Sequence, residues 1–155
     1  MRFDKWSVTA QEALQSAMGM AADADAGQME PIHLLKALLD SGERNIRAII
    51  ERVGADPDQV ENATNEAIAH EPKVTGSSGR MGISNELVKV GDAAEKLASK
   101  MGDSYVTSEH LFIALCDDHG AAGRALRAAG ITCQRMRDAY DELRGDCRVT
   151  AAGSK

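Results

Sequence analysis

Two histidines at matching places in two related segments are the first candidates for chemistry. His33 opens HLLKALLD and His110 opens HLFIALCD, with five of eight positions identical at a constant offset of 110 − 33 = 77 residues. A metal site would need further ligands one turn on, where the chain has Ala37 and Ala114. An imidazole near a helix start commonly hydrogen-bonds a backbone group or a cap. We therefore interpret both histidines as structural and expect no metal site.

Three cysteines are the candidate nucleophiles. Cys116, Cys133 and Cys147 are odd in number and lack CxxC spacing, so neither a disulfide framework nor a zinc knuckle is indicated. Cys116 lies on the apolar face of its helix and is interpreted as a small core residue. Cys133 begins the last helix, either as a reactive thiol or as an incidental half-buried one. No base is marked as a partner for either thiol, so we expect no catalytic residue, and reduced thiols favour a cytoplasmic location.

Two carboxylates precede the second histidine in the chain. Asp103 follows a glycine and Glu109 stands at a helix start. Asp103 could be a turn residue, and Glu109 could be there because a carboxylate is favourable at a helix N-terminus. Alternatively, both present negative charge beside an apolar groove, where they would recruit basic or unfolded peptide segments. The residue pattern leaves both interpretations open.

A tandem duplication positions these residues. The offset of the histidines also pairs Ser7 with Ser84, Ala17 with Ala94 and Ala21 with Ala98. Repeats of this kind cannot bury their apolar faces alone and stack on each other. At 155 residues the chain is therefore expected to be one domain. We assign repeat one to about 3–70, a Gly/Ser-rich linker to 71–83, repeat two to 84–145 and a disordered tail to 146–155.

The fold class predicted from apolar periodicity is all-α, with eight helices in two pseudo-repeated four-helix units and no strand. Ser7 or Thr9 caps the first helix, the latter in a capping box with Glu12. Thr107 or Ser108 caps the sixth. The helices are expected at about 7–23, 30–40, 43–53, 57–70, 84–102, 107–116, 121–129 and 132–144.

Composition narrows the classes of partner. The formal net charge of −6 and the pI near 5.2 oppose binding to phosphate backbones and anionic bilayers, so we expect neither nucleic acid nor membrane as a partner. No apolar stretch approaches the roughly 20 residues that span a bilayer. The start of the chain also lacks the apolar run of a signal peptide.

Four segments carry a resemblance to a known family: MRFDK at 1–5, AQEAL at 10–14, EPIHLLKALL at 30–39 and SEHLFIAL at 108–115. Together they resemble the Clp N-terminal (Clp repeat) domain, and most closely that of the ClpB disaggregases. The resemblance covers residues 1 to about 150. It implies a Clp N-terminal domain over 1–145 that precedes two AAA+ ATPase rings in a hexamer. Such a module binds unfolded or aggregated polypeptide, or an adaptor protein.

The rings themselves have no counterpart in this sequence. No Walker motif, arginine-finger context or middle-domain coiled coil occurs, so we expect neither ATP hydrolysis nor a cofactor in this chain. The chain is then either an excised domain, as its abrupt end suggests, or a stand-alone Clp-repeat regulator that docks on a Clp protease or chaperone. One departure concerns the ClpC branch, where a glutamate before each histidine is linked to phosphoarginine recognition. In this chain the second repeat has the glutamate, Glu109, whereas the first repeat has Ile32 in its place. Two equivalent phosphoarginine pockets are therefore not expected.

A peptide-binding groove is predicted between the first helix of each repeat and the start of the sixth helix. Each of its apolar residues could instead be core, because amphipathic helices routinely bury such stripes. Asp103 and Glu109 are placed at the rim. The predicted walls are Ser7, Ala10, Leu14, Leu87, Val88, Gly91, Leu111 and Phe112.

Overall fold

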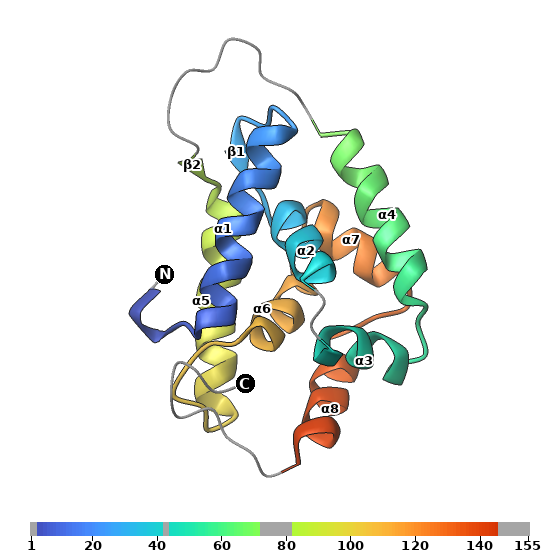
Figure 1. The fold of residues 1–155 in the computed structure, drawn as a ribbon. Coiled ribbons are helices and arrows are strands. Elements are labelled where there is room, and N and C mark those ends of the chain that lie inside the picture. Colours follow the sequence, from blue (N-terminus) through green and yellow to red (C-terminus); the bar gives the residue numbers. More distant parts are fainter. Residues whose placement is uncertain (1–2, 42–43, 72–81, 146–155) are drawn as a thin grey trace.

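The fold is all-α, as predicted, with eight helices in the part of the chain that the computed structural model describes, residues 3–41, 44–71 and 82–145 (Figure 1). A 3-10 turn, η1 (Phe3–Lys5), precedes the first helix. The helices of repeat one are α1 (Val8–Asp23), α2 (Pro31–Asp40), α3 (Arg44–Arg52) and α4 (Pro57–Ala69). Those of repeat two are α5 (Asn85–Lys100), α6 (Ser108–Leu115), α7 (Ala121–Ala128) and α8 (Cys133–Arg144).

Equivalent side chains begin the equivalent long helices. The Ser7 hydroxyl accepts the backbone N–H of Ala10 at 3.2 Å, and the Ser84 hydroxyl accepts that of Leu87 at 3.1 Å. Each bond satisfies an N–H that the helix itself leaves unpaired. The alternative capping box of Thr9 with Glu12 is wrong, because Thr9 lies inside the first turn of α1. The duplication therefore extends to the capping chemistry, and α1 and α5 are both 16 residues long.

The third helix of each repeat ends at a glycine. Gly54 after α3 has φ +88° and Gly130 after α7 has φ +83°. Only glycine takes this left-handed conformation without a steric cost, which makes it the common residue just past a helix end. The ranges predicted for these helices, 43–53 and 121–129, end within one residue of α3 and α7.

The two repeats interlock around a shared core. The short helices α2 and α6 lie in the middle of the molecule, with α1 packed on α2 and α5 on α6 (Figure 1). The other helices pair between repeats, α3 with α8 and α4 with α7. Leu34, Leu35 and Leu111 of the central helices are fully buried. Burying such a side chain stabilises the fold by about 1.5–3 kcal/mol, and neither repeat would bury its share alone.

Two very short parallel strands depart from the prediction. β1 (Gln28–Met29) pairs with β2 (Gly82–Ile83), and an isolated bridge joins Trp6 to Val106. A two-residue strand is too short to show a period of alternation, so it could not be predicted from the residue pattern. β2 takes up the end of the predicted linker. The rest of that linker, residues 72–81, and the predicted tail lie outside the described residues.

None of the helices within the described ranges is long and apolar enough to cross a lipid bilayer.

Candidate binding groove

His33 and His110, the equivalent histidines of the two repeats, each cap the helix that contains them. Nδ1 of His33 accepts the N–H of Glu30 at 2.9 Å, and Nδ1 of His110 accepts the N–H of Thr107 at 2.9 Å. Both rings are fully buried. An accepting Nδ1 leaves the proton of a neutral imidazole on Nε2. The structural role predicted for the pair is therefore confirmed.

The two histidines differ in the hydrogen bonding of their second ring nitrogen, Nε2. Nε2 of His110 lies 2.8 Å from Oδ2 of Asp103. Nε2 of His33 is buried and has no hydrogen-bond partner among the described residues. At the offset of the repeat, Asp103 corresponds to Ala26, which explains why repeat one lacks the matching acceptor.

Asp103 is the centre of a buried polar network. Its Oδ2 also accepts Nη1 of Arg144 at 2.7 Å, and the Asp103 side chain has no exposed surface. Arg144 in turn donates to the carbonyl of Met101 at 3.2 Å and lies 4.8 Å from the ring centroid of Tyr140. The network ties the α5–α6 loop to α6 and α8. The predicted rim position of Asp103 is wrong, because its charge is compensated by Arg144 inside the domain.

Glu109 is also an interior residue. Its Oε2 accepts Nδ2 of Asn45 at 2.8 Å, and its side chain is fully buried. Asn45 lies in the first turn of α3, so this bond joins the two repeats. The predicted rim position is wrong for Glu109 as well. Ile32, which takes the equivalent place in repeat one, is an apolar core residue.

The predicted groove walls belong mainly to the core. Their side chains form the inward stripes of α1, α5 and α6, so the structure has no open groove at these positions. Val88 is half-buried. The buried members are Ser7, Ala10, Leu14, Leu87, Gly91, Leu111 and Phe112.

An open groove instead follows the outer side of α5, toward α6 and α8. It consists of two hollows of about 270 and 430 Å³ that share Ala93, Ala114 and Asp117. Its apolar floor is formed by Ala93 and Leu97, which are half-buried, together with Ile113 and Ala114, which are buried. We call this the α5 groove. Its remaining lining residues are Glu86, Lys89, Val90, Lys96, Lys100, Asp118, His119, Cys133, Gln134 and Arg137.

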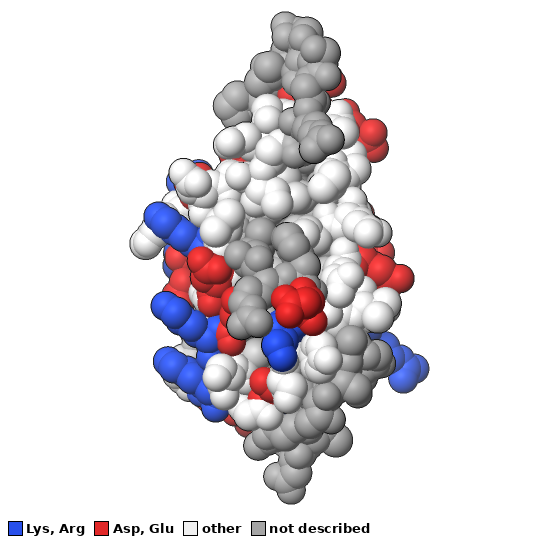
Figure 2. Space-filling view, turned by 90° about the vertical axis from the view of Figure 1, so that its left-hand side faces the viewer, with Lys and Arg blue, Asp and Glu red and all other residues white. Residues whose placement is uncertain are grey.

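Charge is distributed unevenly along the α5 groove. One hollow has three basic side chains and one acidic one, Lys96, Lys100, Arg137 and Asp117. The other has three acidic side chains and one basic one, Glu86, Asp117, Asp118 and Lys89. Figure 2, which views the side of the molecule where α1 and α5 lie, shows basic side chains gathered along one edge of this face. The groove therefore combines an apolar floor with a basic end, which suits an extended segment that has apolar and acidic side chains.

Repeat one has a hollow at the equivalent place with different chemistry. A space of about 650 Å³ lies between α1 and α2, lined by Thr9, Glu12, Ala13, Gln15, Ser16, Ala37 and Ser41. At the repeat offset, Ser16 replaces Ala93 and Glu12 replaces Lys89. No lysine or arginine occurs in α1. Both repeats therefore have a hollow at this place, but different side chains line it.

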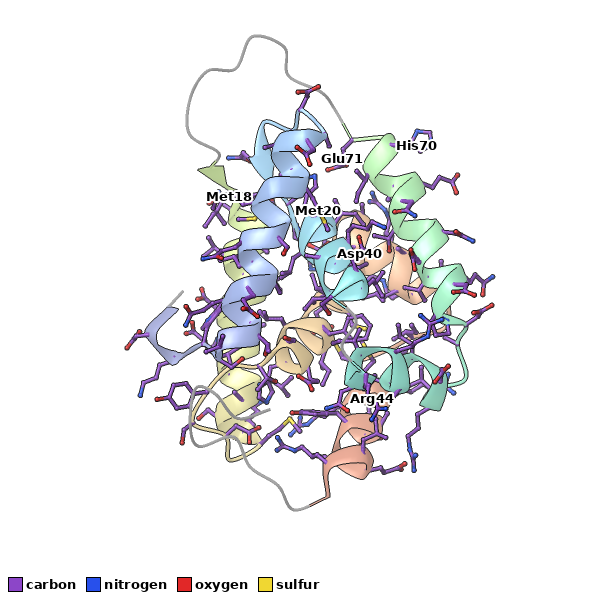
Figure 3. The ribbon with its side chains drawn as sticks, viewed as in Figure 1. Met18, Met20, Asp40, Arg44, His70 and Glu71 are labelled. Carbon is purple, nitrogen blue, oxygen red and sulfur yellow. The ribbon has the colours of Figure 1, made fainter. Side chains whose placement is uncertain are left out.

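The outer side of α1 carries isolated apolar side chains. Met18 is 42% exposed and Val8 is 50% exposed. Met18 lies on the side of α1 away from α2, whereas Met20 lies toward α2 (Figure 3) and packs partly buried against the core. Single exposed apolar residues are normal on a protein surface and define no site.

Sequence reasoning missed the residues of the α5 groove, although a signal was present. Lys89, Lys96 and Lys100 recur at intervals of a helical face, and the equivalent helix of repeat one has no basic residue. That contrast marks the exposed side of α5. The apolar floor gave no such signal, because Leu97 and Ile113 follow the same helical period as the core.

Acid is expected to destabilise the domain through its histidines. Burial lowers the pKa of His33, and burial lowers the pKa of His110 although the bond to Asp103 opposes the effect. The unfolded chain then binds more protons than the native state below about pH 6.5. This contribution to stability is complete above that pH and is lost as the pH falls.

Replacing His33 by asparagine isolates the effect, because the amide oxygen can still accept the Glu30 N–H without titrating. We expect His33→Asn to lose less free energy of unfolding than the unsubstituted chain between about pH 7.5 and pH 5. Urea unfolding followed by circular dichroism at the two pH values measures this. Equal losses would show that His33 does not titrate with unfolding.

Structural comparison defines the class of domain. The N-terminal domain of Hsp104 from Candida albicans superposes with a TM-score of 0.85 over 97% of this chain and 99% of that one, at 22% identity. The N-domain of ClpV from Vibrio cholerae superposes with a TM-score of 0.76 over 93% of this chain and 87% of that one, at 20% identity. Both comparisons show that this chain has the fold of a Clp-type N-terminal domain.

The sequence comparison identifies the family. The family model of the Clp repeat (R) N-terminal domain matches residues 5–139, and the chain belongs to this family. Chaperone protein ClpB of Agrobacterium fabrum is 38% identical over 145 residues, which are 93% of this chain and 17% of that protein. ClpB of Propionibacterium freudenreichii is 34% identical over 156 residues, covering 100% of this chain and 18% of that protein. The chain thus spans under a fifth of the length of these relatives.

Proposed function

We propose that this chain is the substrate- or adaptor-binding N-terminal module of a ClpB-type AAA+ chaperone. It engages unfolded or aggregated polypeptide along the α5 groove, without a cofactor of its own. The observation that carries the proposal is the apolar floor of the groove, where the half-buried Ala93 and Leu97 lie beside basic side chains. The identity to ClpB proteins supports the assignment to that branch.

The groove would act by weak and sequence-tolerant contact. Ala93 and Leu97 offer an apolar surface whose contacts are non-directional, so different apolar residues of a client can pack on it. Lys96 and Lys100 would attract acidic groups nearby and speed encounter, an effect that salt screens. Rapid, reversible binding of this kind suits a module that presents polypeptide to a separate ATPase.

An adaptor would use the same kind of contact. A solved complex of a ClpV N-domain with a VipB peptide has a TM-score of 0.73 to this chain over 93% of it, at 22% identity. That relative binds a peptide, which supports a peptide as the unit of recognition here. A peptide segment of an adaptor and a segment of an unfolded client would therefore compete.

The repeat supplies a matched test of the groove. Ala93→Glu places a carboxylate on the apolar floor, whereas Ser16→Glu places one at the equivalent position of repeat one. We expect Ala93→Glu to weaken binding of fluorescent, reduced and carboxymethylated α-lactalbumin about tenfold or more, a loss of about 1.4 kcal/mol. Ser16→Glu should leave it within about twofold.

Fluorescence anisotropy titrations measure both affinities, and thermal unfolding controls for the fold of each variant. Binding that is lost in Ser16→Glu and kept in Ala93→Glu would assign the site to repeat one. Binding that both folded variants keep would contradict the proposed groove.

A further inference from the structure

Two thiols meet where the end of α6 crosses the start of α8. Cys133 donates through Sγ to the carbonyl of Ile113 at 3.3 Å, and Ile113 lies three residues before Cys116, the C-cap residue of α6. Cys116 donates through Sγ to the carbonyl of Ile131 at 3.9 Å, two residues before Cys133. Each thiol is therefore placed against the backbone that carries the other, and one helix, α7, separates the two cysteines in the chain.

The two thiols differ in access. Cys116 is 3% exposed, whereas Cys133 is half-buried and lines the hollow of about 270 Å³ in the α5 groove. A small reagent in this hollow would meet Cys133 first. A hydrogen bond with Cys133, together with burial, raises the pKa of the Cys116 thiol. Cys116 is thus the slower nucleophile of the pair, since the thiolate is the reactive form.

We propose that Cys116 and Cys133 form a dithiol site for low-molecular-weight disulfides, with Cys133 as the entry thiol and Cys116 as the resolving thiol. This goes beyond the sequence interpretation of the two cysteines, and it holds whether or not the groove binds peptide.

The reaction is two successive thiol–disulfide exchanges. The Cys133 thiolate attacks one sulfur of oxidised glutathione, forms a mixed disulfide and expels a glutathione thiolate. Cys116 then loses its proton to solvent and attacks Sγ of Cys133, which expels the second glutathione thiolate. In sum, two protein thiols give up two electrons and two protons, and one small disulfide is reduced to two thiols. The product joins the end of α6 to the start of α8.

Oxidation of the folded chain tests the site directly. Cys147 lies outside the described residues, so it is first replaced by serine to leave only the pair. We expect oxidised glutathione to give first an adduct on Cys133 and then an internal disulfide, detected by mass spectrometry of acid-quenched peptides. The second step should accelerate as the pH rises, because it requires the Cys116 thiolate.

Variants with one of the two cysteines replaced distinguish the entry thiol from the resolving thiol. In the Cys147→Ser background, Cys116→Ala should accumulate a lasting adduct on Cys133, and Cys133→Ala should leave Cys116 reduced. Circular dichroism confirms that each variant is folded. A lasting adduct in the chain that has both cysteines, at alkaline as well as neutral pH, would overturn the proposal.

A trivalent arsenical provides a readout that needs no oxidation. Phenylarsine oxide bridges two thiols only when they are close, so one equivalent should protect both cysteines of the native chain from maleimide. Neither single variant should gain this protection. Failure of the arsenical to protect the pair would also overturn the proposal, since the thiols would then not meet in the native state.

Discussion

Replacing Asp103 by alanine is expected to lower the free energy of unfolding by about 3–5 kcal/mol. Oδ2 of Asp103 receives both Nε2 of His110 and Nη1 of Arg144, at 2.8 and 2.7 Å. The Arg144 side chain is only 7% exposed. Alanine removes the acceptor and leaves a guanidinium without its counter-charge inside the domain, which costs more than the loss of the pair itself.

A surface ion pair of the same length provides the control. Arg52 donates to Glu142 at 2.7 Å, but the two side chains are 49% and 59% exposed. Arg52→Ala should cost no more than about 1 kcal/mol, because water screens the pair. Urea unfolding near neutral pH compares the two variants. Similar small losses would show that the Asp103 network does not hold the α5–α6 loop to α8.

The second large effect is expected at Gly123 in α7. A Cβ built on Gly123 would lie within the contact distance of the Asp118 carbonyl and 2.8 Å from Nη1 of Arg127. Arg127 itself donates to that carbonyl and to the carbonyl of Cys116. We expect Gly123→Ala to destabilise the domain by about 3 kcal/mol, at the upper end of the cost of overpacking, although alanine favours a helix.

Gly19 supplies the opposite case. It lies in α1, and apart from the helix's own backbone and its chain neighbours no described residue has an atom within 4 Å of its built Cβ. Gly19→Ala should therefore stabilise the domain by about 0.5–1 kcal/mol, through helix propensity and lower entropy of the unfolded chain. Thermal unfolding compares the two substitutions. A rise of the melting temperature for both would contradict the close approach of α7 to the Asp118 carbonyl.

The helices could be predicted from sequence because their ends carry local signals. Ser84, Pro31 and Gly130 act through their own backbone or the next turn, so no tertiary information is needed to interpret them. The repeat added a second, independent copy of most signals. The two short strands carried no such signal, because their pairing joins residues far apart in the chain.

The candidate site was harder to predict, because the helical period does not show which apolar residues of a helix are buried in the core and which face solvent. Leu87 and Leu97 both follow the helical period of α5, yet Leu87 is core and Leu97 forms part of the groove floor. Asp103 was misplaced for a related reason. Its main partner, Arg144, is 41 residues away in the chain, and no local pattern links them.

The duplication explains why the two repeats differ in the chemistry of their surfaces. Both copies need the same central helix, and both keep the histidine that caps it. The outer helices are free of that requirement, so Ser16 and Ala93 diverge at equivalent places. The peptide-binding groove therefore stays a proposal, and its place moves from the buried residues predicted from sequence to the outer side of α5.

Chemical-shift mapping with an unfolded client tests the central claim most directly. Labelled amides of the folded chain are followed during titration with reduced, carboxymethylated α-lactalbumin. The α5 groove predicts shifts that cluster on Ala93, Leu97, Ile113 and Ala114, with none at Ser16 or Ala13 of repeat one. Shifts confined to α3 and α4, or to the hollow between α1 and α2, would contradict it.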